Sequence, residues 1–164
     1  MVDKIYNVLF VCTGNSARSI LAEGLLKQLG GKRFKAFSAG SHPNGKVNPF
    51  ALSTLQALRV PTDGFRSENW DEFAQPSSPA LDFVFTVCDN AAGEMCPVWP
   101  GQPMSAHWGV PDPATVEGTA AEKARAFMDI AVTLKRRIEL MLALPIASLD
   151  SMSVLREVRK IGTS

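Results

Sequence analysis

Residues 8–29 of this 164-residue chain constrain its fold more than any other stretch. An apolar run over residues 8–11 ends at Cys12, and a short loop, Thr-Gly-Asn-Ser-Ala, follows at residues 13–17. Beyond the loop, leucines at positions 21, 25 and 29 have the spacing of one helix face. The pattern therefore predicts a strand, a tight loop and a helix, with Cys12 and Arg18 at the two ends of the loop.

The predicted loop has the chemistry to bind a tetrahedral oxyanion. Successive backbone N–H groups in a tight loop form a concave nest, and a following helix adds free N–H groups and a partial positive charge. Arg18 can add a planar, bidentate contact, and Gly14 is expected where a Cβ atom would block the turn. The oxyanion-binding residues predicted in this way are Thr13, Gly14, Asn15, Ser16, Ala17 and Arg18.

Cys12 is the candidate nucleophile of this loop. Ser19 can donate a hydrogen bond to its sulfur, and thiols at helix N-termini can have pKa values well below the free value of about 8.5. The loop is therefore expected to lower the pKa of Cys12, so that a thiolate attacks the bound anion. The alternative is an inert cysteine buried at a strand end, which the preceding strand, the following helix, Gly14 and Ser19 make the weaker interpretation.

The composition bounds the class of protein. A hydrophobic content of 46%, a charged content of 20% and a net charge of +1 fit one domain over residues 1–164. They predict neither a nucleic-acid-binding nor a membrane-binding surface. The three cysteines are an odd and sparse set for a secreted disulfide framework, and no signal-peptide pattern is present. We therefore expect a cytoplasmic protein, in which paired thiols are more often catalytic than structural.

Strands alternate with helices along the chain. Strands are expected at residues 5–12, 35–39, 81–87 and 104–108, and helices at residues 19–30, 48–58, 67–73, 119–144 and 151–161. The alternation predicts an α/β fold with a parallel sheet and right-handed crossovers. Ligands in such folds bind at the carboxyl ends of the strands. Trp70 and Phe73 are expected to be core anchors.

The sequence Cys-Thr-Gly-Asn-Ser-x-Arg-Ser at residues 12–19 resembles the low-molecular-weight protein tyrosine phosphatase superfamily, which includes arsenate reductases of the same fold. The resemblance implies a four-stranded parallel sheet in the order 2-1-3-4 with helices on both faces. In that order Cys12 and Cys88 end neighbouring strands about 4.8 Å apart, which suits a disulfide. It also implies that Asp112, in an Asp-Pro loop, is the general acid, although an Asp-Pro pair can simply start a turn.

Two further cysteines discriminate between the branches of this superfamily. The segment from Val87 to Pro97 resembles the resolving-cysteine region of the phosphatase-like arsenate reductases. In that family a first thiolate attacks arsenate, a second cysteine releases arsenite, and a third takes over the disulfide. By position these are Cys12, Cys88 and Cys96. The resemblance implies arsenate or phosphate as the bound oxyanion, no tightly bound cofactor, and thioredoxin or a glutathione–glutaredoxin pair as the external thiol donor.

A phosphatase acting on phosphotyrosine or a small phosphoester is the main alternative, because it would use the same nucleophile and acid. Ala17 stands where these phosphatases commonly carry a second cysteine, and Ala114 and Thr115 stand where they tend to have tyrosines. Both differences weaken the phosphatase interpretation. A non-enzymatic oxyanion sensor is a third class, but it has no use for Asp112 as an acid.

Some members of the superfamily also bind a potassium ion beside the loop. The corresponding residues here are Asn15, Glu23 and Ser38, so the resemblance implies a potassium site at this position. No other metal site is expected, since no group of histidines and cysteines has the spacing of metal ligands.

Overall fold

The computed structural model describes residues 4–88, 99 and 101–164 of the chain, and these form an α/β fold around one sheet. Four parallel strands lie in the order β2-β1-β3-β4, which confirms the predicted order. Their bounds are β1 (Tyr6–Cys12), β2 (Phe34–Gly40), β3 (Phe83–Thr86) and β4 (Met104–His107). None of the helices in the described ranges is long and apolar enough to cross a membrane.

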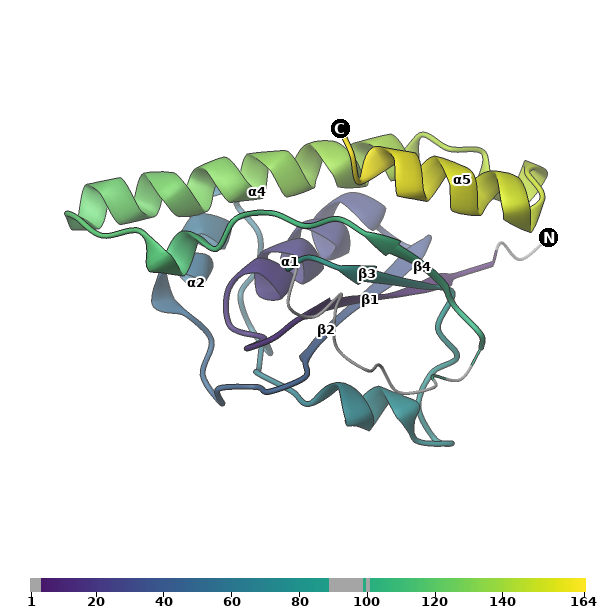
Figure 1. Ribbon diagram of the computed structural model, residues 1–164, viewed down its shortest axis with the longest axis horizontal. Coiled ribbons are helices and arrows are strands. Elements are labelled where there is room, and N and C mark those ends of the chain that lie inside the picture. Colours follow the sequence, from purple (N-terminus) through teal and green to yellow (C-terminus); the bar gives the residue numbers. More distant parts are fainter. Residues whose placement is uncertain (1–3, 89–98, 100) are drawn as a thin grey trace.

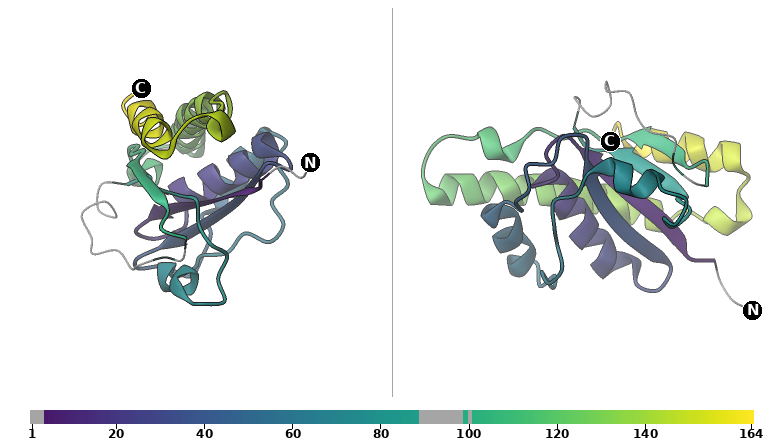
Figure 2. Two further views of the ribbon diagram at one scale, coloured as in Figure 1. Left: turned by 90° about the vertical axis from the view of Figure 1, so that its right-hand side faces the viewer. Right: turned by 90° about the horizontal axis from the view of Figure 1, so that it is seen from below.

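Helices cover the two faces of the sheet unequally (Figures 1 and 2). One face carries α1 (Arg18–Gly30), α4 (Ala120–Leu142) and α5 (Ser151–Ile161), with α2 (Pro49–Ala57) packed against α1 and α4. The other face carries the short 3-10 helix η1 (Trp70–Ala74), whose Trp70 and Phe73 are buried as predicted. Two further 3-10 turns, η2 (Pro113–Thr115) and η3 (Ile146–Ser148), flank α4 in the sequence.

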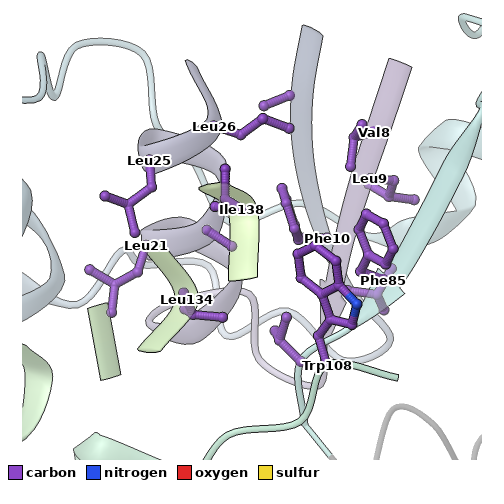
Figure 3. Close-up of a cluster of buried hydrophobic side chains, with 14 of the residues drawn as sticks. Val8, Leu9, Phe10, Leu21, Leu25, Leu26, Phe85, Trp108, Leu134 and Ile138 are labelled. Carbon is purple, nitrogen blue, oxygen red and sulfur yellow. The ribbon is translucent and has the colours of Figure 1, made fainter. Parts of the chain in front are cut away.

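The core lies between the sheet and the large helices (Figure 3). Phe10 of β1 and Phe85 of β3 pack with Trp108, whose ring stacks on Phe85 at a centroid distance of 3.9 Å. The indole N–H of Trp108 donates to the carbonyl of Val158 in α5 at 2.8 Å, so its polar atom is satisfied. Truncation of a buried aromatic residue of this kind costs about 3–5 kcal/mol. Trp108 therefore ties the end of β4 to the helical layer.

Helix starts follow the local capping chemistry. The side chain of Asn48 caps α2, with Pro49 in its first turn, and Thr119 and Glu122 form a capping box at the start of α4, both as predicted. The helix predicted from residue 67 instead begins at Trp70. Asn69 caps it in a box with Glu72, whereas the hydroxyl of Ser67 donates to the carbonyl of Gly14. Ser67 is thus part of the contacts around the N-terminal loop.

The strand register brings the carboxyl ends of β1 and β3 together. Val11 pairs with Thr86, and the N–H of Val87 donates to the carbonyl of Val11 at 2.9 Å. Cys12 ends β1 and Cys88 lies two residues beyond the end of β3, so the two cysteines lie at the ends of adjacent strands, as the order 2-1-3-4 predicts. Any site that uses both thiols must lie at this edge of the sheet.

Candidate active site

The loop at residues 13–17 is held from outside by residues 41–48, which follow β2. Four N–H groups of that segment donate to carbonyls of the loop and of Cys12. The pairs are Ser41 to Cys12 at 3.3 Å, His42 to Thr13 at 2.9 Å, Asn44 to Gly14 at 3.1 Å and Asn48 to Ser16 at 2.9 Å. A trans peptide directs each carbonyl and the next N–H to opposite sides. The N–H groups of Thr13, Gly14, Asn15 and Ala17 are therefore directed inward, and in the described part of the chain the N–H groups of Gly14, Asn15 and Ala17 meet no backbone acceptor. This is the geometry of an anion-binding nest.

Asn15, rather than Gly14, gives the loop its left-handed turn. Asn15 has φ 46°, in the region that a nest requires. A Cβ atom at Gly14 would come no closer than 3.7 Å to a neighbour, so the expectation of a steric need for glycine there is wrong. The glycine that the loop does require is Gly40 of β2. A Cβ atom at Gly40 would lie 2.5 Å from the carbonyl oxygen of Thr13.

The side chain of Asn15 connects three elements around the loop. Its amide nitrogen donates to Ser19 Oγ in α1 at 2.8 Å and to Ser38 Oγ in β2 at 3.0 Å. Its oxygen accepts the N–H of Glu68 at 2.6 Å. Asn15 is fully buried, so each of these contacts replaces a hydrogen bond to water. The loop conformation is thus fixed from inside as well as from outside.

Cys12 lies beneath the loop, with 3% of its surface exposed. Its sulfur is 3.1 Å from Ser19 Oγ, the contact expected from the sequence. It also shares a hydrogen bond with the thiol of Cys88, and this contact, followed by burial, raises the pKa of Cys12. Ser19 acts in the opposite direction but does not prevail. The expected lowering of the Cys12 pKa is therefore wrong for this arrangement, because that expectation considered the helix N-terminus and Ser19 but neither the hydrogen bond with Cys88 nor burial.

Arg18 and Asp112 meet above the carboxyl ends of the strands. Arg18 donates from Nη1 to the carbonyl of Val110 at 3.1 Å, and its Nη2 lies 3.6 Å from Asp112 Oδ2. Both residues line a pocket of about 510 Å³, together with Cys88. The other carboxylate oxygen of Asp112 accepts the N–H of Ala114 and caps η2. Asp112 therefore occupies a turn, as the alternative predicts, and also faces the pocket with the arginine.

The second predicted thiol, Cys88, is buried beside Cys12 and lies 3.5 Å from Thr13 Oγ1. It lines the pocket with Arg18 and Asp112. The third, Cys96, lies outside the described residues. The structure thus brings four predicted residues to one place: Cys12, Arg18, Cys88 and Asp112.

The residues of the expected potassium site also lie together, but they bond to one another. Ser38 Oγ donates to Glu23 Oε1 at 2.5 Å, and the Nζ atom of Lys27 lies 2.6 Å from Glu23 Oε2. The oxygen of Asn15 accepts the N–H of Glu68, and its nitrogen faces Ser38. Lys27 already supplies a positive charge to this carboxylate. A potassium ion at these oxygen atoms stays a prediction, and it would have to compete with Lys27 for the carboxylate. The described residues contain no group of three or more His, Cys, Asp or Glu side chains that could hold a metal ion.

Several residues that shape the site were not foreseen. Residues 41–48 support the loop from outside, Lys27 pairs with Glu23, and the carbonyl of Val110 binds Arg18. The one available signal was the polar run after the second strand. Since parallel strands end at the same edge of a sheet, a segment that follows β2 lies close to one that follows β1.

The chain matches the family model described as low molecular weight phosphotyrosine protein phosphatase over residues 7–152. It is 36% identical to an arsenate reductase of Halalkalibacterium halodurans, over 80% of this chain and 91% of that protein. It is 34% identical to an arsenate reductase of Bacillus subtilis, over 85% of this chain and 95% of that protein.

Solved structures give the same relationship. An arsenate reductase in the phosphate-binding state superimposes with a TM-score of 0.66 at 25% identity, over 85% of this chain and 98% of that one. A thioredoxin-dependent arsenate reductase of Corynebacterium glutamicum gives a TM-score of 0.56 at 25% identity, over 85% of this chain and 65% of that one. The protein therefore belongs to the low-molecular-weight phosphotyrosine protein phosphatase family and, within it, is similar to the arsenate reductases.

Proposed function

We propose that this protein reduces arsenate to arsenite with a cysteine nucleophile and a thiol–disulfide relay. The observation that carries the proposal is the pair of buried thiols, Cys12 and Cys88, which share a hydrogen bond beside an oxyanion nest. A phosphatase needs one nucleophilic thiol, whereas reduction of arsenate needs two electrons and hence two thiols. The similarity to arsenate reductases supports the same activity.

In the first step, the inward N–H groups of the loop and Arg18 hold arsenate above Cys12. The Cys12 thiolate attacks arsenic and forms a sulfur–arsenic bond while one arsenic–oxygen bond breaks. Asp112 donates a proton to the departing oxygen, which leaves as water. Cys12 must lose its proton before it attacks, although its hydrogen bond with Cys88 opposes this loss. The N–H groups of the nest favour the resulting negative charge at sulfur.

In the second step, Cys88 attacks the sulfur of Cys12 and forms a disulfide. The sulfur–arsenic bond breaks, and arsenic keeps the electron pair and leaves as arsenite. The adjacent ends of β1 and β3 supply the short separation that this step requires. Arsenate thereby gains two electrons, and the two thiols lose them.

In the third step, Cys96 attacks Cys88, which releases Cys12 as a thiolate and leaves a Cys88–Cys96 disulfide. An external dithiol then reduces this disulfide. The thioredoxin-dependent relative makes thioredoxin the first candidate donor, with a glutathione–glutaredoxin pair as the second.

Hydrolysis of a phosphoester is the second candidate activity. The nearness of Arg18 to Asp112 favours it, because a nucleophile, an anion grip and an acid are the machinery that such hydrolysis needs. It does not need Cys88. Substitution of that thiol therefore separates the two functions.

The test is arsenate-dependent NADPH oxidation with thioredoxin and glutaredoxin systems in parallel, beside hydrolysis of a chromogenic phosphoester. Cys12→Ser should abolish both reactions, because one sulfur starts both. Cys88→Ser should abolish arsenate reduction and leave phosphoester hydrolysis. If Cys88→Ser still reduced arsenate, the relay through Cys88 would be wrong. If the unaltered protein hydrolysed the phosphoester but did not reduce arsenate, the phosphatase function would take the place of the reductase function.

A further inference from the structure

Arg137 of α4 is a buried arginine that no part of the proposed chemistry uses. It is 7% exposed. Its Nη1 donates to the carbonyls of Trp108 at 2.9 Å and Gly109 at 3.2 Å, and its Nη2 donates to Ser164 at 3.2 Å. Its Nε is buried and has no partner among the described residues. Within that part of the chain, no aspartate or glutamate forms an ion pair with it.

A guanidinium in this position is costly. Burial lowers the pKa of Arg137, and the neighbouring Arg136 acts in the same direction. An apolar side chain of similar volume would fill the space without the loss of hydration that a buried charge suffers. Stability of the core alone is therefore a weak reason for an arginine here. Two of its three hydrogen bonds point to another reason, because they fall on one particular loop.

That loop joins β4 to η2 and carries Asp112. The chain from β4 to η2 runs alongside α4 (Figure 1), and η2 packs against that helix. Three consecutive carbonyls at residues 108–110 accept hydrogen bonds from arginines, the first two from Arg137 and the third from Arg18. On the other side, the N–H groups of Trp108 and Val110 donate to β3 and its extension at 2.7 and 3.1 Å. The base of the loop is thus fixed between α4, the nest and the sheet.

We propose that Arg137 is a positioning residue for the general acid. It holds the carbonyls of Trp108 and Gly109, so that Asp112, a few residues further along, stays beside Arg18 and the bound oxyanion. Arg137 does not contact the pocket itself; it acts through the loop. This inference rests on the proposed role of Asp112.

The experiment compares three single variants in single-turnover reduction of arsenate. Arg137→Met removes the donors, and Arg137→Lys keeps one charged donor that can reach the two carbonyls now bound by Nη1. Arg136→Met is the matched control, because Arg136 is exposed and also donates to Ser164, at 3.0 Å, without contacting the loop. Thermal denaturation of each variant reports whether the fold is kept.

Misplacement of a catalytic group by about 1 Å can cost about 10²-fold in rate. We therefore expect Arg137→Met to lower the rate of arsenite formation on that scale, with affinity for inorganic phosphate unchanged. Arg137→Lys should restore part of the rate, and Arg136→Met should match the unaltered protein. If Arg137→Met fails to fold, the rate of Arg137→Lys against Arg136→Met decides the question. Equal rates for those two would overturn the inference.

A double-mutant cycle with Asp112→Asn distinguishes failure of the positioning role of Arg137 from failure of the proposed general-acid role of Asp112. If Arg137 acts through Asp112, adding Arg137→Met to Asp112→Asn should change the rate by less than about twofold. If Arg137→Met lowered the rate equally in the unaltered protein and in Asp112→Asn, or also lowered the affinity for phosphate, Arg137 would not position the acid. The role of Asp112 as the acid would be unaffected by that result. An unchanged rate in Asp112→Asn alone would instead remove the proposed acid, and the inference with it.

Discussion

At the scale of single residues, the hydrogen bond between the Cys12 and Cys88 thiols sets the protonation of the nucleophile. It is the largest cause of the raised Cys12 pKa. Cys88→Ala should therefore lower the pKa of Cys12, and Ser19→Ala should raise it further, because the Ser19 contacts lower it. Titration followed by thiolate absorbance measures both shifts. Shifts in one common direction would contradict this account.

The same raised pKa links stability to pH. The folded pKa of Cys12 lies above the unfolded value of about 8.5, so the folded state holds a proton that the unfolded state releases. This protonated thiol contributes fully to the free energy of unfolding at a pH below the unfolded pKa. The contribution is lost as the pH rises through the folded pKa of Cys12. Urea unfolding at increasing alkaline pH should show this loss, and Cys88→Ala should reduce it. A Cys88→Ala protein with the same pH dependence would show that another group titrates.

Asp112 combines a structural and a chemical role. Asparagine is as good a helix cap as aspartate, so Asp112→Asn should keep the η2 turn while removing the proton donor. We expect a loss of about 10²–10⁴-fold in phosphoester hydrolysis, the usual scale for a general acid, and a loss in arsenate reduction. Steady-state kinetics measures both. Unchanged rates would leave Asp112 as a turn residue.

At the scale of elements, the close contact between β2 and the loop is the feature most exposed to substitution. A Cβ atom at Gly40 would meet the backbone of Thr13, which cannot move without distorting the nest. Gly40→Ala should therefore weaken binding of inorganic phosphate. Gly24→Ala is the control, because its Cβ would also make a short contact, 2.9 Å from the Leu55 side chain, but away from the loop. Calorimetric titration should show lost affinity in the first variant alone; equal losses would contradict a specific effect on the loop.

The elements themselves were predictable to the extent that their signals are local. The capping residues Asn48 and Thr119 set the starts of α2 and α4 correctly. The start of η1 was misplaced because Ser67 and Asn69 are both plausible caps, and a contact across the fold, from Ser67 to Gly14, decides between them. Such a contact cannot be inferred from neighbouring residues.

At the scale of the whole molecule, the sequence located the site but not its surroundings. Cys12, Arg18, Cys88 and Asp112 meet because parallel strands end at one edge, a rule that holds for open α/β sheets in general. The strand order itself came from a family resemblance. The outer support by residues 41–48, the pair of Lys27 with Glu23, and Arg137 beneath the acid loop depend on long-range packing. The wrong direction predicted for the Cys12 pKa has another origin: Cys88 was expected beside Cys12, but the effect of its hydrogen bond on the pKa was not considered.

The central claim is that arsenate is reduced by Cys12 and Cys88 before any other thiol takes part. Fully reduced Cys96→Ser protein should be mixed with one equivalent of arsenate, and arsenite and disulfides should then be measured by speciation and mass mapping. The account predicts one arsenite per protein and a trapped Cys12–Cys88 disulfide, with neither product when Cys12→Ser is added. Arsenite formed without that disulfide, or no arsenite from a protein that still hydrolyses a phosphoester, would contradict it.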